Sequence, residues 1–144
     1  MGRDSGVRRV LVATDRSETA QHAEAWAAEM AERYGAELLL LRVAVGGPPP
    51  AGTEDELAAH ARELAGERGR AVVVTGEDPA RSIVEAAEAQ DADVLVVGNV
   101  GMSGRKEFLL GNVPNRVSHQ SRRTVVIVNT MQQVEQRKKG WFRR

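Results

Sequence analysis

A chain of 144 residues has the length of one domain and can bury a core. Its 20 basic and 20 acidic residues cancel, so the overall charge does not indicate a nucleic acid or a membrane as partner. The lack of cysteine excludes disulfides and thiolate metal sites, and fits a reducing compartment. Because the N-terminus lacks the apolar segment of a signal peptide, and no apolar run approaches the roughly 20 residues of a membrane span, we expect a cytoplasmic protein.

The first part of the chain predicts a strand, a helix and a second strand. Residues 10–13 are an apolar run of the kind found in strands that are buried on both faces. Asp15 or Ser17 would cap the following helix, in which alanines recur at helical spacing and which Gly35 would end. Residues 37–45 predict a second strand, parallel to the first, because the helix between them supplies the crossover.

The same alternation continues to the end of the domain. Residues 53–56 have the pattern of a capping box at a helix start, and Asp78-Pro79 has the pattern of a cap followed by a first helical residue. Further elements are strands at 71–75, 93–97 and 124–128, and a short helix at 114–121. Strands that alternate with helices predict an α/β fold with one doubly wound sheet and helices on both faces.

A glycine-rich stretch, residues 98–115, follows the fourth strand. Glycines allow a ligand to approach the backbone, and the first amides of a helix can bind phosphate, but the same pattern also suits a plain surface loop. Asp15 is open to the same two interpretations, as a helix cap or as a ligand-binding acid. If the first and fourth strands are neighbours, Asp15 and the glycine-rich stretch share one crevice.

Other site motifs are missing from the sequence. Gly98-x2-Gly101-x2-Gly104 lacks the spacing of the dinucleotide fingerprint, and the residues after Gly104 lack the ending of a P-loop. The three histidines, His22, His60 and His119, lie on separate predicted helices, so we take them as surface residues. Since no set of side chains indicates acid-base or nucleophilic catalysis, we predict no catalytic residues and no metal site.

Thr14-Asp15, the strand end at Val43, and Gly98-x2-Gly101-x9-Gly111-Asn112 resemble the nucleotide-binding branch of the universal stress protein family, which is UspA-like. The resemblance covers residues 7–130. It implies a flavodoxin-like, five-stranded parallel sheet in the order 3-2-1-4-5, flanked by about four helices. It also implies a regulatory stress-response homodimer that pairs through the last strand, at Val125, Val126, Ile127 and Val128.

The resemblance further implies an adenine-nucleotide site at the strand ends. Asp15 would accept hydrogen bonds from the ribose hydroxyls, Val43 would border the adenine, and the glycine-rich stretch would surround the phosphates. The residues that it implicates are Ala13, Thr14, Asp15, Val43, Val97, Gly98, Gly101, Gly111, Asn112 and Val113.

Two positions depart from the family pattern. Asn112 stands where the family usually has Ser or Thr, so one hydroxyl contact to phosphate is lost. The resemblance implies ATP, with Mg²⁺ if it is bound, as one ligand, but the lost contact counts against a triphosphate. Cyclic AMP is another, because residues 98–101 also resemble actinobacterial members that favour cyclic AMP, which needs fewer phosphate contacts. Arg16 replaces the usual glycine after Asp15 and either reaches phosphate or points into water.

Two alternatives to nucleotide binding by a regulator stay open. One is a ligand-free dimeric interaction module that docks an unknown protein partner, and the other is a slow ATPase. Outside the domain, residues 1–6 and the basic tail at 131–144 are expected to be flexible termini. The tail mixes cations with Trp141 and Phe142, but we do not expect it to bind a nucleic acid or a membrane.

Overall fold

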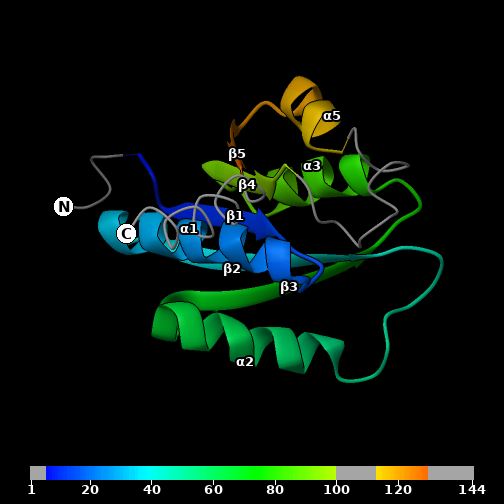
Figure 1. Ribbon diagram of the computed structural model, residues 1–144, viewed down its shortest axis with the longest axis horizontal. Coiled ribbons are helices and arrows are strands. Elements are labelled where there is room, and N and C mark those ends of the chain that lie inside the picture. Colours follow the sequence, from blue (N-terminus) through cyan, green and yellow to red (C-terminus); the bar gives the residue numbers. More distant parts are fainter. Residues whose placement is uncertain (1–5, 100–112, 130–144) are drawn as a thin grey trace, which may run out of the picture.

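One parallel sheet with five strands forms the centre of the molecule, in the order β3-β2-β1-β4-β5 (Figure 1). The computed structural model describes residues 6–99 and 113–129. The strands are β1 (Arg9–Ala13), β2 (Glu37–Ala44), β3 (Gly69–Thr75), β4 (Val94–Gly98) and β5 (Thr124–Val128). Each neighbouring pair is parallel. The predicted fold class and strand order are confirmed, including the adjacency of the first and fourth strands.

Helices cover both faces of this sheet, as the alternating pattern predicts. The helices are α1 (Glu18–Tyr34), α2 (Thr53–Ala65), α3 (Pro79–Ala89) and α5 (Val113–Gln120), with a short 3-10 turn, η2 (Gly66–Arg68), after α2. Side chains of α1 and α2 pack in one core cluster, and those of α3 and α5 pack in a second cluster on the opposite face. None of the described helices is long and apolar enough to cross a membrane.

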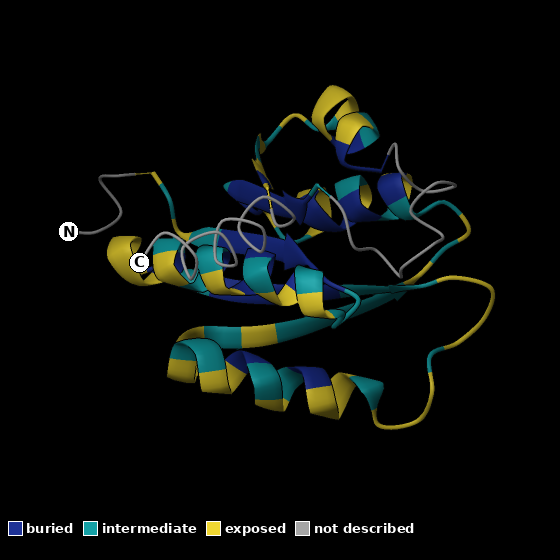
Figure 2. Cartoon of the chain, viewed as in Figure 1, coloured by how far each residue is buried: buried dark blue, intermediate teal, exposed yellow. Residues whose placement is uncertain are grey.

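The core sits around the three inner strands of the sheet, β2, β1 and β4. Residues Leu38, Leu39, Leu40 and Leu41 of β2 are buried with no exposed surface, and they point alternately into the two clusters. Each such side chain contributes about 1.5–3 kcal/mol of hydrophobic stabilisation. Figure 2 shows the central strands as the most buried part of the molecule, whereas the edge strand β3 is only half-buried. The continuous apolar runs in the sequence therefore mark strands that are covered on both faces.

The helix ends follow the predicted signals in two cases and differ in a third. Asp78 accepts from the Arg81 amide at the start of α3, and Gly35, at φ 66°, ends α1. The capping box at residues 53–56 is wrong. Gly52 occupies the cap position and makes no side-chain capping bond, so Thr53 is the first residue of α2, and its hydroxyl donates to the Pro50 carbonyl at 2.7 Å.

The register brings the carboxyl ends of three strands to one edge of the sheet. Ala13 pairs with Leu41, and Val12 pairs with Val96. The residues that follow β1 therefore lie between the end of β2 and the end of β4, where the direction of winding switches. Open α/β sheets bind ligands at such switch points.

Candidate functional site

The candidate site is the edge formed by the carboxyl ends of β1, β2 and β4. The Thr14 amide donates to the Leu41 carbonyl at 2.9 Å, which ends the pairing of β1 with β2. β2 continues past this point, and Val43 pairs with Val74 on its other side. By register, Val43 is level with Asp15, and Gly98 of β4 is level with Thr14. The structure thus brings these four predicted residues together.

Most of the predicted site residues at this edge are buried. Ala13, Thr14, Val97, Gly98 and Val113 are buried, whereas Asp15 and Val43 are partly exposed. A ligand at the strand ends would therefore contact Asp15 and Val43 most directly. Three further predicted residues, Gly101, Gly111 and Asn112, lie outside the described part of the chain, so their predicted roles stay predictions.

Asp15 has one carboxylate oxygen in use and one without a partner. Oδ1 accepts from the Ser17 amide at 2.9 Å. Oδ2 is buried and has no hydrogen-bond partner among the described residues. The cap of α1 is Ser17, whose Oγ accepts from the Ala20 amide at 3.2 Å. A buried acceptor without a donor is costly, so Oδ2 is a natural acceptor for a hydroxyl or an amide of a ligand.

A buried acid, Glu24 of α1, lies beside this turn. It is 1 % exposed. The Thr14 hydroxyl donates to its Oε2, and Nη1 of Arg16 lies 2.8 and 2.9 Å from its two oxygens. His60 of α2 places Nε2 2.8 Å from Oε1. We call Glu24 with these three partners the Glu24 cluster. Its carboxylate accepts from Thr14 and Arg16, and also from His60 in the tautomer that carries a proton on Nε2, so that a buried charge is compensated.

The Glu24 cluster corrects two expectations. His60 is not a surface residue, because α1 and α2 pack on the same face of the sheet and its side chain, 20 % exposed, lies against Glu24. Glu24 itself was not predicted from the sequence, although a signal was present. Glu24 follows Ala20 by four residues and precedes Ala27 by three, so it falls on the buried face of α1.

The guanidinium of Arg16 is bound to Glu24 and does not simply point into water, whereas its contact with a phosphate stays a prediction. Its backbone has a φ of 67°, in the left-handed region that residues with a Cβ rarely adopt. Such a conformation persists only when its surroundings impose it. Here the Arg16 amide donates to the Thr14 hydroxyl oxygen at 2.9 Å, and the side chain is held by Glu24.

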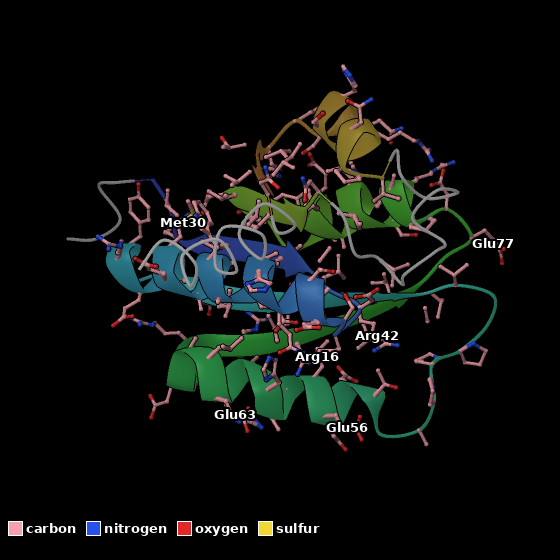
Figure 3. The ribbon with its side chains drawn as sticks, in the orientation of Figure 1. Arg16, Met30, Arg42, Glu56, Glu63 and Glu77 are labelled. Carbon is pink, nitrogen blue, oxygen red and sulfur yellow. The ribbon has the colours of Figure 1, made fainter. Side chains whose placement is uncertain are left out.

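A cavity of about 390 Å³ opens next to the Glu24 cluster, on the side of the sheet that α2 covers. Figure 3 shows Arg16 and Arg42 near this space, with Glu56 and Glu63 extending from α2. Arg42 forms no ion pair with any residue that the structure describes, but Arg16 is neutralised by Glu24. The cavity therefore presents charges of both signs and does not select an anion or a cation by itself.

The other side of the site is fixed by an ion pair between α3 and α5. Nη2 of Arg116 lies 2.6 Å from Oδ2 of Asp78, and Nη1 lies 3.1 Å from Oδ1. The guanidinium lowers the pKa of the Asp78 carboxyl because it donates hydrogen bonds to the ionised form. Val113, at the start of α5, is buried in the same core cluster as Val97 of β4. Within the described residues, no group of three or more potential ligands could hold a metal ion.

Comparisons with known proteins agree with this fold. The family model described as the universal stress protein family matches residues 6–129. The chain belongs to the universal stress protein family. The family inferred from the strand-end motifs is thereby confirmed. In this universal stress protein, the positive φ of Arg16 also accounts for the glycine expected at that position, because glycine adopts such a φ without strain.

Individual relatives resemble this universal stress protein to different extents. Universal stress protein Rv1636 of Mycobacterium tuberculosis strain H37Rv is 46% identical over 52 residues, a segment that spans only 36% of either chain. The crystal structure of a universal stress protein in complex with cAMP is 34% identical, with a TM-score of 0.67 over 85% of this chain and 97% of that one. The universal stress protein of Archaeoglobus fulgidus in complex with dAMP is 21% identical, with a TM-score of 0.63 over 85% of this chain and 98% of its own, and supports the fold alone.

The Asp78–Arg116 pair predicts a lowered pKa that can be measured directly. An NMR titration should place the pKa of Asp78 below that of an ordinary aspartate, and Arg116→Gln should raise it, because the donated hydrogen bonds are lost. Because the pKa of Asp78 is lower in the folded than in the unfolded protein, the pair gives its full stabilisation at pH values above the pKa of Asp78 in the unfolded protein. This contribution is lost as the pH falls through the folded pKa.

The control for this titration is Arg122→Gln, which removes an exposed cation beside Glu88, at the other end of α3, and should leave the Asp78 midpoint in place. Equal midpoints in the wild type and in Arg116→Gln would contradict the pairing of α3 with α5.

Proposed function

We propose that this universal stress protein binds an adenine nucleotide across the carboxyl ends of β1 and β4, with Asp15 as the acceptor for the ribose hydroxyls. The observation that carries the proposal is the buried Oδ2 of Asp15, which has no partner among the described residues. An ionised carboxylate is a pure acceptor, and a ribose hydroxyl is a suitable donor. The relative crystallised with cAMP, at 34% identity, supports the choice of an adenine nucleotide.

The backbone of Val43 supports the same ligand class. In a parallel strand, successive residues direct their amide and carbonyl to alternate sides. Leu41 accepts from Thr14 on the β1 side, and Ala44 accepts from Gly76 on the β3 side. The amide and carbonyl of Val43 are therefore directed to the β1 side, beyond the last paired residue of β1. A donor and an acceptor at this spacing suit the edge of an adenine base, which also carries both.

The phosphates would extend toward the start of α5 at Val113, where the first amides of a helix attract negative charge. Gly98 allows close approach at the end of β4. Arg16 adds little positive charge there, because Glu24 neutralises it. This arrangement favours a nucleotide with few charges, such as cyclic AMP, but ATP with Mg²⁺ is a second candidate, and both belong in the binding test. Bound nucleotide would then act as a regulatory signal in the stress response, with no catalytic step at this site.

We also propose that the protein forms a homodimer through β5. Among the described strands, β5 pairs only with β4 and is an edge of the sheet. Its side chains Val125 and Val126 are partly exposed and Ile127 is 44 % exposed, whereas Val128 is buried. An apolar edge strand with unpaired backbone groups favours association with another strand. A second copy of this chain would supply that strand and cover Ile127.

Calorimetric titration with ATP, in the presence of Mg²⁺, and with cyclic AMP tests the binding proposal. At least one of the two should bind the wild type saturably. Asp15→Asn keeps the size of the side chain but replaces an acceptor oxygen by a donor group and removes the charge, so the dissociation constant should rise by about 10- to 100-fold. Glu18→Gln, at a nearby exposed acid, is the matched control and should bind like the wild type.

Absence of saturable binding to both nucleotides would contradict the proposal and favour the ligand-free interaction module. ATP turnover that disappears in Asp15→Ala would favour the slow ATPase instead.

Size-exclusion chromatography with light scattering tests the dimer. The wild type should have the mass of two chains, and Ile127→Lys should have the mass of one, because a charged side chain would have to be buried at the interface. Tyr34→Lys changes another exposed apolar residue, at the end of α1, and should leave the dimer intact. A dimer that survives Ile127→Lys would place the interface elsewhere.

A further inference from the structure

We infer that Glu24 is a positioning residue for the nucleotide site, which keeps Oδ2 of Asp15 free for the ribose by holding Arg16 away from it. This inference rests on the proposed function and assigns a role to a residue that does not contact the ligand. The supporting observation is the Glu24 cluster, in which the side chains of Thr14, Arg16 and His60 converge on one buried carboxylate.

Glu24 fixes both neighbours of Asp15. Thr14 precedes Asp15 and donates its hydroxyl to Glu24, and Arg16 follows Asp15 and places its guanidinium on both carboxylate oxygens. The Arg16 amide in turn donates to the Thr14 hydroxyl oxygen at 2.9 Å. Asp15 is thus the middle residue of a turn whose two ends are tied to one buried group. The direction of its side chain follows from that turn.

The pairing with Glu24 also removes the strongest competitor for Asp15. Arg16 is adjacent to Asp15 in the chain, and a guanidinium prefers to bind a carboxylate through two parallel hydrogen bonds. Without Glu24, Arg16 would be an unpaired cation beside an unpaired anion. It would then relax from its φ of 67° and bind Oδ2, the atom that the ribose requires. By binding Arg16, Glu24 therefore keeps Oδ2 of Asp15 available as an acceptor.

This role predicts an effect on the choice of sugar. If Oδ2 accepts from the ribose, the 2′-hydroxyl contributes to the affinity, and a deoxyribose analogue lacks that donor. Glu24 should then set the preference for ribose over deoxyribose, although it lies on α1 and is 1 % exposed. A residue that only stabilises the fold would weaken both kinds of nucleotide to the same extent.

The experiment compares cyclic AMP with 2′-deoxy cyclic AMP, and ATP with dATP, by calorimetric titration. The wild type should bind the ribose form of at least one pair about tenfold more tightly than the deoxy form. In Glu24→Gln, the dissociation constant of the ribose form should rise about tenfold while that of the deoxy form stays the same, so that the preference disappears. Glu29→Gln is the matched control, because Glu29 lies on the same helix, is exposed and also pairs with an arginine.

A double variant separates positioning from a general loss of structure. Adding Arg16→Gly to Glu24→Gln removes the cation that would bind Asp15, and glycine adopts the positive φ without strain. Because the double variant replaces both Glu24 and Arg16, neither member of their ion pair is left without its partner. The preference for ribose should return in this double variant. If Glu24→Gln does not fold, Glu24→Asp, whose shorter side chain cannot reach Thr14 and Arg16 together, replaces it with the same expectation.

Two binding results would overturn the inference, and a third binding result concerns the proposed function. A preference for ribose that persists in Glu24→Gln, or that stays lost in the double variant, would contradict the positioning role. A wild type that binds neither pair would contradict the proposed function. In that case hydrogen exchange at the Arg16 and Ser17 amides decides the role of Glu24. The inference predicts faster exchange in Glu24→Gln than in the wild type and no change in Glu29→Gln, and equal exchange in all three would overturn it.

Discussion

The strand-end turn of this protein depends on one buried carboxylate. A charge removed from water must be compensated by hydrogen bonds, and Glu24 obtains them from Thr14, Arg16 and His60. Two of these partners belong to the turn after β1, and the third belongs to α2. A single buried group therefore joins the turn, the first helix and the second helix. It also explains how a residue with a side chain occupies a conformation that suits glycine.

The parallel sheet determines where this turn lies. Because β1 sits between β2 and β4, the chain leaves β1 at the point where the winding of the sheet changes direction. β2 extends beyond the end of β1, which leaves the backbone of Val43 level with Asp15. The ion pair between Asp78 and Arg116 joins the start of α3 to α5, whose first residue, Val113, is buried in the same core cluster as Val97 of β4. The fold thus produces an edge with backbone donors and acceptors and with one carboxylate oxygen, Oδ2 of Asp15, that has no partner among the described residues.

Much of the fold could be predicted from the sequence because its signals are local. The apolar runs mark the strands, and the patterns at Gly35 and Asp78 mark helix ends that the structure confirms. The adjacency of β1 and β4 and the strand order came from the family resemblance, since periodicity does not specify which strands pair. The predicted capping box at residues 53–56 is wrong because α2 begins at Thr53 itself, with Gly52 in the cap position.

The candidate site could be predicted only in part. Asp15, Val43 and Gly98 were identified by motif, and the structure brings them to one edge. The Glu24 cluster was missed because it joins residues that are 36 positions apart in the chain, and neither Glu24 nor His60 belongs to a motif. Arg16 was considered without a partner for the same reason. Contacts of this kind depend on how helices pack, which a single sequence does not specify.

A crystal structure of the protein with bound cyclic AMP tests the central claim most directly. The account predicts that a ribose hydroxyl lies about 2.5–2.8 Å from Oδ2 of Asp15, the usual range for a hydroxyl that donates to a carboxylate, while Arg16 stays on Glu24. A complex in which Arg16 binds Asp15, or in which the nucleotide lies away from the ends of β1 and β4, would contradict it.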